Sequence, residues 1–570
     1  MYDIVIRNGL VVDGTGSPGV IADVAVERGR IVAIGELATA EAIRTIDATG
    51  MVVAPGIVDA HTHYDPQLTW DPLCDTAALH GVTTLAAGNC GFSIAPCRSD
   101  DHEYVAQMFA RVEGMDLGSL AHIDWGFETF EDFLDTRAGR LGVNLGMYVG
   151  HSALRRWVMG DAAFERPATD EELASIVAMF ESAMEAGALG LSSSHAPTHL
   201  DLADRPVPSR LASLDELRAL ADAQGRFKRG TVAYAPESAV EGIDAADRDL
   251  LIEIAGRANA PVITQGLGGR SKVDAPTTTW MQSRDFLERS VSLEAPVFSL
   301  LMTRPLNGPF TIREGTTRYE GVPLWNQLMI ATAQEKQRLL ADDAHRSMLR
   351  AAIDQPNRDP AKGSTLPPPL WESMRVSQTF DDSTARFAGR TVTDIADELG
   401  KHPADVMFDI ALADDLTTVF HWSNETPAWR ELLKDVQRHS QMIVGVSDGG
   451  AHLDRDDGQE WPSHFLATWW RTEQVWTLEE AIAQITSVPA SILGLHDRGR
   501  LEVGLPADIY IFDPEQIGAG TCRQETDAVT GAARFRAVPV GAIATLVNGV
   551  VVVENGSATG ELPGVVVRPS

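Results

Sequence analysis

The chain has 570 residues, of which 44% are hydrophobic and 22% charged, a composition typical of a globular protein with a sizeable buried core. Its formal net charge of −33 would repel nucleic-acid phosphates and anionic lipid headgroups, so we expect neither as a partner. No apolar run is long enough to predict a membrane span, and the first residues lack the regions of a signal peptide. Four cysteines are too few for a disulfide framework, which favours a reducing cytoplasm.

The two ends of the chain share one pattern, short runs in which apolar and polar residues alternate. Near the N-terminus this pattern predicts antiparallel strands at residues 2–7, 11–12 and 31–34. Near the C-terminus it predicts a strand at 508–512 and a hairpin at 545–552, whose Asn-Gly pair is a favoured two-residue turn. We therefore expect a small β-sandwich domain built from both termini, comprising residues 1–54 and 491–570.

The middle of the chain, residues 55–490, alternates short apolar runs with amphipathic helical stretches such as 170–186 and 213–223. This alternation predicts parallel strands connected by helices. Eight strands are predicted, a number that suits a closed (β/α)8 TIM-like barrel: 57–58, 82–86, 143–149, 188–191, 232–234, 261–264, 297–301 and 442–446. A long insertion, around residues 302–440, separates the last two and is expected to lie over the active face.

The segment PGIVDAHTH, residues 55–63, carries the strongest chemical signal. His61 and His63 lie two residues apart at the end of the first predicted barrel strand, so their side chains share a face. The carboxyl end of a barrel strand is where enzymes of this fold place reactive groups. Two imidazoles at that position predict a metal site.

PGIVDAHTH resembles the first-strand motif of the amidohydrolase superfamily. Residues 504–509, GLPADI, resemble the G-x-x-A-D segment where the β-domain of that superfamily resumes. Asp448, in Ser-Asp-Gly after the last predicted strand, occupies the position of its catalytic aspartate. The resemblance spans almost the whole chain and implies a metal-dependent hydrolase that cleaves an amide-type C–N bond with an activated water. It also implies that Asp448 is both a metal ligand and the general base.

A finer resemblance is to D-aminoacylases, the N-acyl-D-amino-acid deacylases. It rests on GVTT and GNCGFS within residues 81–93, VGHSALR at 149–155 and GALGLS at 187–192. In that subfamily a cysteine on the second strand replaces a carboxylated lysine as a metal ligand. The resemblance therefore implies that Cys90 binds zinc, alongside His61, His63 and Asp448.

Two histidines expected of that subfamily are missing. The fifth predicted strand runs into Glu237, and the sixth has Gln265 where the histidine would fall. The remaining ligands can still hold one metal ion, so we expect one or two divalent ions. Zinc is favoured, and manganese or cobalt are alternatives. His195 and Glu237 are candidate substitute ligands, and His151 and Gln265 are candidate substrate contacts or ligands.

The lysine expected to hold a substrate carboxylate is also missing, which favours a larger or neutral small-molecule substrate. Five tryptophans could line an apolar pocket or belong to the core: Trp371, Trp422, Trp461, Trp469 and Trp470. Three alternatives stay open: a deaminase, a lactone or cyclic-amide hydrolase on the same barrel, and a degenerate barrel that only binds a ligand. The sequence is compatible with a homo-oligomer.

Overall fold

Eight parallel strands form a barrel in the computed structural model, which describes every residue except 240–241, 269–275, 320–321, 356–369, 424 and 453–457. The strands are β6 (Ile57–Asp59), β7 (Val82–Ala87), β8 (Asn144–Met147) with its continuation β9 (Val149–Gly150), β10 (Leu191–Ser194), β11 (Val232–Ala235), β12 (Val262–Gln265), β13 (Val297–Leu301) and β17 (Met442–Val444). Each pairs with the next in parallel, in the order β6-β7-β8 and β9-β10-β11-β12-β13-β17. The prediction of eight barrel strands is confirmed.

The barrel is closed between its last and first strands. Thr62 and Gly449 form a parallel bridge, and the His63 amide donates to the Gly449 carbonyl at 2.6 Å. This bridge brings the segment after β17 against the segment after β6. It therefore places two chain regions that are almost 400 residues apart at the same point of the barrel mouth.

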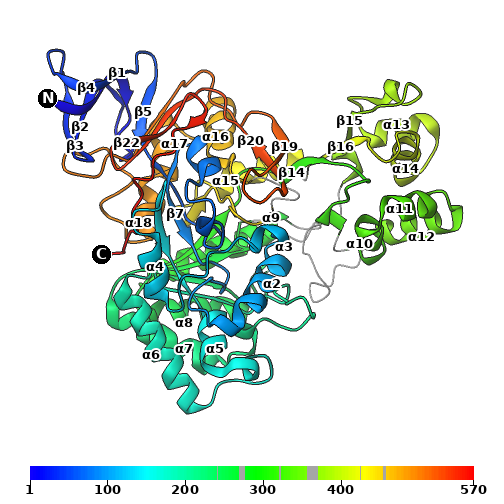
Figure 1. The fold of residues 1–570 in the computed structure, drawn as a ribbon, viewed down its shortest axis with the longest axis horizontal. Helices are drawn as coiled ribbons and strands as arrows, with labels where there is room; N and C mark the ends of the chain where they lie inside the picture. Colours follow the sequence, from blue (N-terminus) through cyan, green and yellow to red (C-terminus); the bar gives the residue numbers. More distant parts are fainter. Residues whose placement is uncertain (240–241, 269–275, 320–321, 356–369, 424, 453–457) are drawn as a thin grey trace.

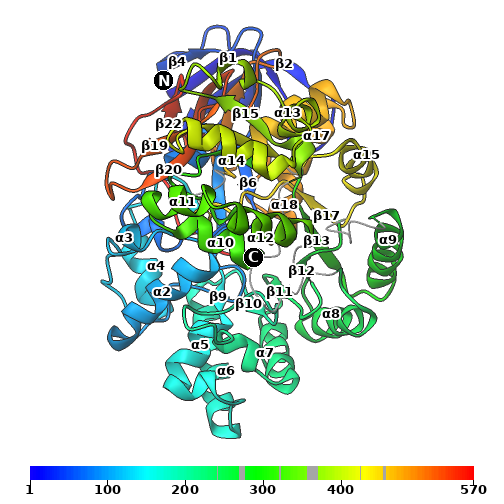
Figure 2. The same cartoon turned by 90° about the vertical axis from the view of Figure 1, so that its right-hand side faces the viewer.

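The barrel strands are connected mainly by helices, several of which lie on its outer side in Figure 2. Their bounds are α1 (Asp75–Leu79), α2 (His102–Val112), α3 (Leu117–Leu120), α4 (Phe130–Arg137), α5 (His151–Met159), α6 (Asp170–Ala186), α7 (Leu214–Phe227), α8 (Ala245–Ala258), α9 (Pro276–Ser292), α15 (Pro427–Val436), α16 (Trp461–Phe465), α17 (Leu478–Ile485) and α18 (Ser487–Ile492). The predicted helix 170–186 is α6, which begins with a capping box between Thr169 and Glu172. None of the described helices is long and apolar enough to cross a membrane.

Strands from both ends of the chain form one nine-stranded sheet beside the barrel (Figure 1). The strands are β1 (Tyr2–Val11), β2 (Val20–Glu27), β3 (Arg30–Gly35), β4 (Ala42–Asp47), β5 (Val52–Pro55), β18 (Ile509–Phe512), β21 (Ala542–Val547), β22 (Val550–Glu554) and β23 (Ser557–Ala558). The predicted runs 2–7 and 11–12 lie in or next to the single strand β1, and the run 31–34 lies in β3. Both strands pair antiparallel with β2, which was not predicted, and β1 also pairs in parallel with β4 and β5. A smaller hairpin, β19 (Cys522–Thr526) with β20 (Ala533–Ala537), lies apart from this sheet. The division into residues 1–54 with 491–570 and residues 55–490 stays our proposal.

The insertion forms a lobe that projects from the barrel, at the right of Figure 1. It contains β14 (Asn307–Phe310), β15 (Arg375–Gln378), β16 (Val419–Ser423), α10 (Pro323–Ile330), α11 (Ala333–Leu340), α12 (Asp343–Asp354), α13 (Val392–Leu399) and α14 (Pro403–Ala413). Its buried residues form a hydrophobic cluster of their own around Trp325. Trp422 belongs to this cluster, so it is a core residue of the lobe.

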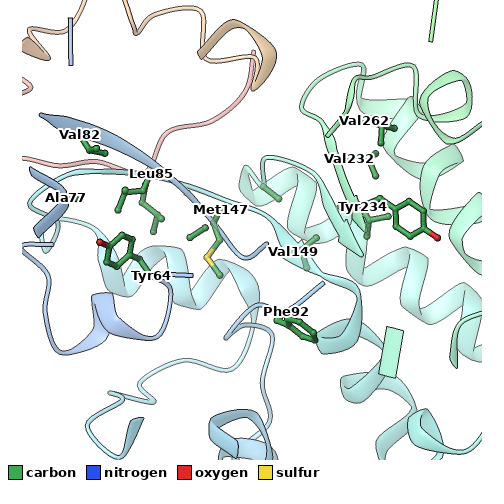
Figure 3. Packing of buried hydrophobic residues seen from close by; sticks show 14 of the residues in the cluster. Tyr64, Ala77, Val82, Leu85, Phe92, Met147, Val149, Val232, Tyr234 and Val262 are labelled. Carbon is green, nitrogen blue, oxygen red and sulfur yellow. The ribbon is translucent and has the colours of Figure 1, made fainter. Parts of the chain in front are cut away.

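The barrel strands pack on the surrounding helices through one large hydrophobic cluster (Figure 3). Buried side chains of successive strands belong to it, among them Val82, Leu85, Met147, Val149, Val232 and Val262, together with helix residues such as Phe109 and Phe180. The strand residues of the opposite face form a separate cluster that includes Val58, Ala86, Ala233, Ile263 and Ile443. Tyr64 and Phe92 pack on the large cluster, and each comes from a loop that follows a strand carrying predicted site residues. The close packing of this core fixes the strand ends, and therefore the side chains that these ends present.

Candidate metal centre

His61 and His63 follow β6 and are almost completely buried, with exposed fractions of 6% and 0%. The turn that carries them is held by Asp59, the last residue of β6. Its carboxylate accepts a hydrogen bond from the Trp461 indole at 2.9 Å and one from the His61 amide at 3.3 Å. Burial raises the pKa of Asp59 above its ordinary value. The aspartate of the PGIVD motif therefore has a positioning role below the two imidazoles.

Asp448 lies in the loop that follows β17, four residues after the strand ends at Val444. Its backbone conformation is left-handed, with φ of 58°. Its Oδ1 lies 3.4 Å from His61 Nε2 and 3.2 Å from His63 Nε2. Desolvation alone would raise its pKa, but the contacts with both imidazoles outweigh it and hold the pKa of Asp448 well below its usual range. The carboxylate is thus ionised at neutral pH and lies between the two rings.

The imidazole of His63 is fully buried, and each of its ring nitrogens faces a carboxylate oxygen, Nε2 that of Asp448 at 3.2 Å and Nδ1 that of Glu113 at 3.5 Å. Burial lowers the pKa of His63, so the ring is neutral at physiological pH. A neutral imidazole keeps one nitrogen lone pair, which is what a metal ligand requires. The state of this side chain fits metal binding.

Cys90 follows β7, and its Sγ lies 3.7 Å from His61 Nε2. Its backbone is left-handed, with φ of 56°, and its thiol forms no disulfide. The neighbouring Gly91 amide donates to Ser192 Oγ at 2.8 Å, and the Asn89 side chain donates to the Thr62 carbonyl at 3.2 Å. These bonds tie the loop after β7 to β10 and to the loop that carries the two histidines.

Two groups of donor atoms follow from these contacts. His61, His63 and Cys90 offer donor atoms within 4.8 Å of one another, and so do His63, Glu113 and Asp448. The separations of 3.4, 3.2 and 3.7 Å match the roughly 3.3–3.6 Å between ligand atoms around a tetrahedral zinc ion. Imidazole, thiolate and carboxylate donors are those that zinc prefers. The residues present therefore fit a divalent transition metal.

Glu113 is the member of these groups that sequence reasoning missed. It follows α2 in the connection between β7 and β8, and only 4% of it is exposed. Its Oε1 lies 3.5 Å from His63 Nδ1. No motif or spacing marks this glutamate, because the fold alone brings the end of α2 to the mouth of the first strand.

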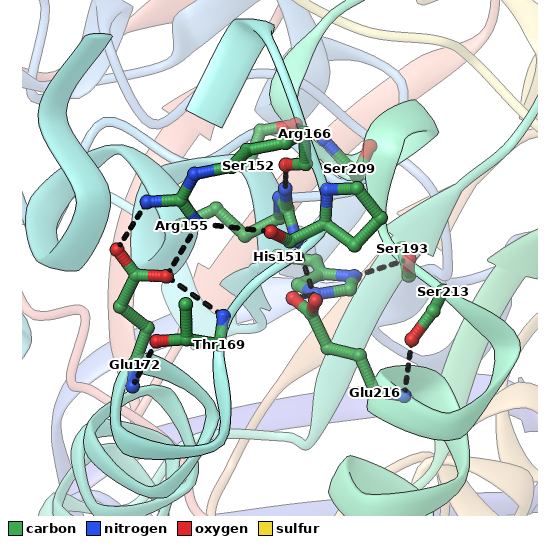
Figure 4. Close-up of polar contacts among 11 residues, drawn as sticks. His151, Ser152, Arg155, Arg166, Thr169, Glu172, Ser193, Ser209, Ser213 and Glu216 are labelled. Atoms are coloured by element: carbon green, nitrogen blue, oxygen red, sulfur yellow. Dashed lines mark hydrogen bonds and ion pairs between the residues drawn. The ribbon is translucent and has the colours of Figure 1, made fainter. Parts of the chain in front are cut away.

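His151, a candidate substrate contact, lies in a separate buried network (Figure 4). Its two ring nitrogens are bonded to Ser193 Oγ and Glu216 Oε1, both at 2.8 Å. Arg155 forms an ion pair with the same glutamate, and all three ionisable side chains are at most 1% exposed. Both nitrogens of His151 are thus engaged within the protein, and the structure does not support a substrate contact.

The candidate substitute ligands His195 and Glu237 have other surroundings. His195 Nδ1 bonds to the Tyr234 hydroxyl at 2.6 Å, and burial lowers the pKa of His195 to about 4. Glu237 is exposed beyond β11, and neither residue belongs to a donor group formed by the described residues. A further histidine beside the site is His452, whose Nε2 lies 3.7 Å from Asp448 Oδ2.

Gln265 ends β12 and lines a pocket of about 140 Å³ together with His61 and Asp448. Most other side chains of the pocket are apolar and come from β13, α15 and the segments beside them: Leu300, Leu301, Met302, Leu306, Trp429, Leu433 and Val446. Arg304 also lines it, and its guanidinium lies 3.4 Å from the Glu460 carboxylate. Trp461 and Trp469 are buried in the cluster between the strands and the helices, and the tryptophan that lines the pocket is Trp429, which the sequence did not single out.

Known proteins resemble this chain over almost its whole length. The model of the amidohydrolase family matches residues 44–553. D-aminoacylase of Alcaligenes xylosoxydans xylosoxydans is 29% identical over 538 residues, which cover 93% of this chain and 92% of that protein. N-acyl-D-aspartate deacylase of the same organism is 28% identical over 577 residues, covering 100% and 95%.

A solved structure has the same fold over the same length. It is N-acyl-D-glutamate deacylase from Bordetella bronchiseptica in complex with zinc and a phosphonate inhibitor, with a TM-score of 0.65, 22% identity and coverage of 100% of this chain and 99% of that one. The chain belongs to the amidohydrolase family, with D-aminoacylase-like relatives, and is a metal-dependent hydrolase of an amide-type C–N bond.

Proposed function

We propose that the protein is a deacylase-like amidohydrolase that hydrolyses a neutral, apolar N-acyl amide with one zinc ion held by His61, His63 and Asp448, Cys90 lying beside it. The observation that carries this proposal is the convergence of both imidazoles on Asp448 Oδ1, at 3.4 and 3.2 Å, beside a pocket with several apolar side chains. A single ion is favoured because the position of the sixth-strand histidine is Gln265 and Glu237 is exposed.

The metal ion and the residues around the pocket have separate roles in the proposed hydrolysis. When bound, zinc supplies Lewis acidity, which polarises a carbonyl and lowers the pKa of a water molecule towards neutrality. Asp448 is ionised, so it accepts the proton of the attacking water and returns it to the leaving amine. Gln265 also lines the pocket, and its side-chain amide can donate a hydrogen bond to the substrate.

The charge of the pocket argues for a neutral substrate. Arg304 is the cationic side chain among the pocket residues described, and Glu460 lies 3.4 Å from it. A guanidinium already neutralised in this way has little attraction left for a free substrate carboxylate. The apolar side chains of β13 and α15 suit an alkyl or aryl acyl group. We further propose a cytoplasmic location, and a homo-oligomer stays compatible with the chain.

Metal-loaded protein should release amine from N-acyl amino-acid amides with longer acyl chains faster than from the matching free acids or N-acetyl compounds. The measurement is amine release across such a panel, with ammonia release followed in parallel. His61→Ala should be inactive, whereas His122→Ala, which removes an exposed histidine away from the site, should behave as wild type. Ammonia release from heterocycles without amine release would instead show a deaminase, and preference for the free acids would refute the neutral pocket.

A further inference from the structure

Glu113 is a buried carboxylate with no role in the mechanism above. It is fixed through its backbone on two sides. Its amide donates to the Phe109 carbonyl at 3.0 Å in the last turn of α2, and its carbonyl accepts from the His452 amide at 2.7 Å. His452 belongs to the loop that carries Asp448. Glu113 therefore joins the connection after β7 to the loop after β17 at the metal centre.

The carboxylate of Glu113 and that of Asp448 approach His63 at different nitrogens. Glu113 Oε1 lies 3.5 Å from Nδ1, whereas Asp448 Oδ1 lies 3.2 Å from Nε2. Asp448 Oδ1 is also the atom that faces His61 Nε2 at 3.4 Å. The Nε2 edge of His63 thus faces Asp448, and its Nδ1 edge faces Glu113.

A neutral imidazole carries its single proton on one nitrogen and leaves the other as an acceptor or ligand. The protonation state that suits metal binding here has the proton on Nδ1, because Nε2 is the nitrogen that faces Asp448 Oδ1, the atom that also contacts His61. A carboxylate beside Nδ1 favours that state and also fixes the ring orientation. It increases the basicity of the ligating nitrogen as well.

We propose that Glu113 is a positioning residue of the metal centre, which accepts the Nδ1 proton of His63 and so presents Nε2 to the metal. The inference rests on the proposed metal site and adds to it a carboxylate that no motif in the chain marks. The burial of Glu113 supports this role, since a buried carboxylate is costly unless an imidazole or another donor faces it.

Zinc affinity of the purified full chain, measured by competition with a chromophoric chelator, tests this role without using activity. Glu113→Ala is expected to weaken zinc binding by roughly 10–100-fold, the usual effect of removing a partner of a metal-bound histidine. Glu113→Gln should weaken it less, because the amide oxygen still accepts the Nδ1 proton but has lost its charge. Glu103→Ala, which removes an exposed carboxylate at the start of α2, should leave the affinity unchanged.

The outcomes separate this role from others. If Glu113 had a purely structural role, its variants would have a lower melting temperature in the metal-free state but the zinc affinity of the wild type. That result would overturn the proposal. Loss of zinc as complete as in His63→Ala also overturns it, because Glu113 would then be a direct ligand. If Glu113→Ala does not fold, the near-isosteric Gln variant decides. A wild type that binds no zinc would refute the proposed function itself, and this inference with it.

Discussion

Asp448→Asn is expected to lower kcat by roughly 10²–10⁴-fold, the usual contribution of a general base. Asparagine preserves the size of the side chain and one oxygen that faces His61 and His63, but it cannot take a proton from water at neutral pH. The carboxylate is matched to the task because its contacts with both imidazoles keep it ionised. Steady-state kcat and bound zinc, measured on the same preparation, check this prediction.

The control for Asp448→Asn is a carboxylate elsewhere on the surface of the barrel. Glu185→Gln changes an exposed residue of α6 and should leave kcat unchanged. Wild-type kcat in Asp448→Asn would show that another group performs proton transfer. Loss of kcat together with all zinc would show that Asp448 acts mainly as a ligand.

Gly445→Ala is expected to destabilise the protein strongly, by about 3 kcal/mol or more from the sum of backbone strain and overpacking. Gly445 has φ of 76°, and a β-carbon there would lie 1.9 Å from the buried ring of Trp461. Trp461 in turn donates to Asp59 below His61. The substitution therefore disturbs both the loop to Asp448 and the support of the histidines. The melting temperature of the metal-free protein measures the loss.

Gly139→Ala is the control that separates the cost of backbone strain from the cost of the steric clash with Trp461. Gly139 has φ of 71°, but a β-carbon there would meet nothing within 4 Å. It should lower stability by only about 1–2 kcal/mol, the cost of a left-handed backbone for alanine. Equal losses in the two variants would mean that the contact between Gly445 and Trp461 does not limit the fold.

Much of the barrel was predictable because each strand is a short apolar run that the core must bury. β13 and β17 are separated by the long insertion, yet both were recognisable from their own composition. The partners of β1 were not, because β4 and β5 are joined to it in parallel by long-range pairing that local alternation does not encode. The lobe core around Trp325 likewise depends on how several helices meet.

Within the candidate site, the sequence marks residues that strand ends present and misses residues that the fold brings from elsewhere. His61, His63, Cys90 and Asp448 each follow a strand, and the structure brings their side chains together. Glu113 ends a helix, so no strand motif identifies it. His151 also follows a strand, but the buried pair Arg155–Glu216 fixes it within the protein, which the local sequence does not reveal.

The most direct test of the account is the metal content of the purified protein, by elemental analysis after reconstitution with zinc and dialysis. We expect one zinc ion per chain in the wild type. His61→Ala should lose most of the bound zinc, and His122→Ala should retain all of it. A second equivalent that survives in His61→Ala would contradict the single site at His61, His63 and Asp448. A wild type without metal after reconstitution would contradict metal-dependent hydrolysis altogether and leave a barrel that only binds a ligand.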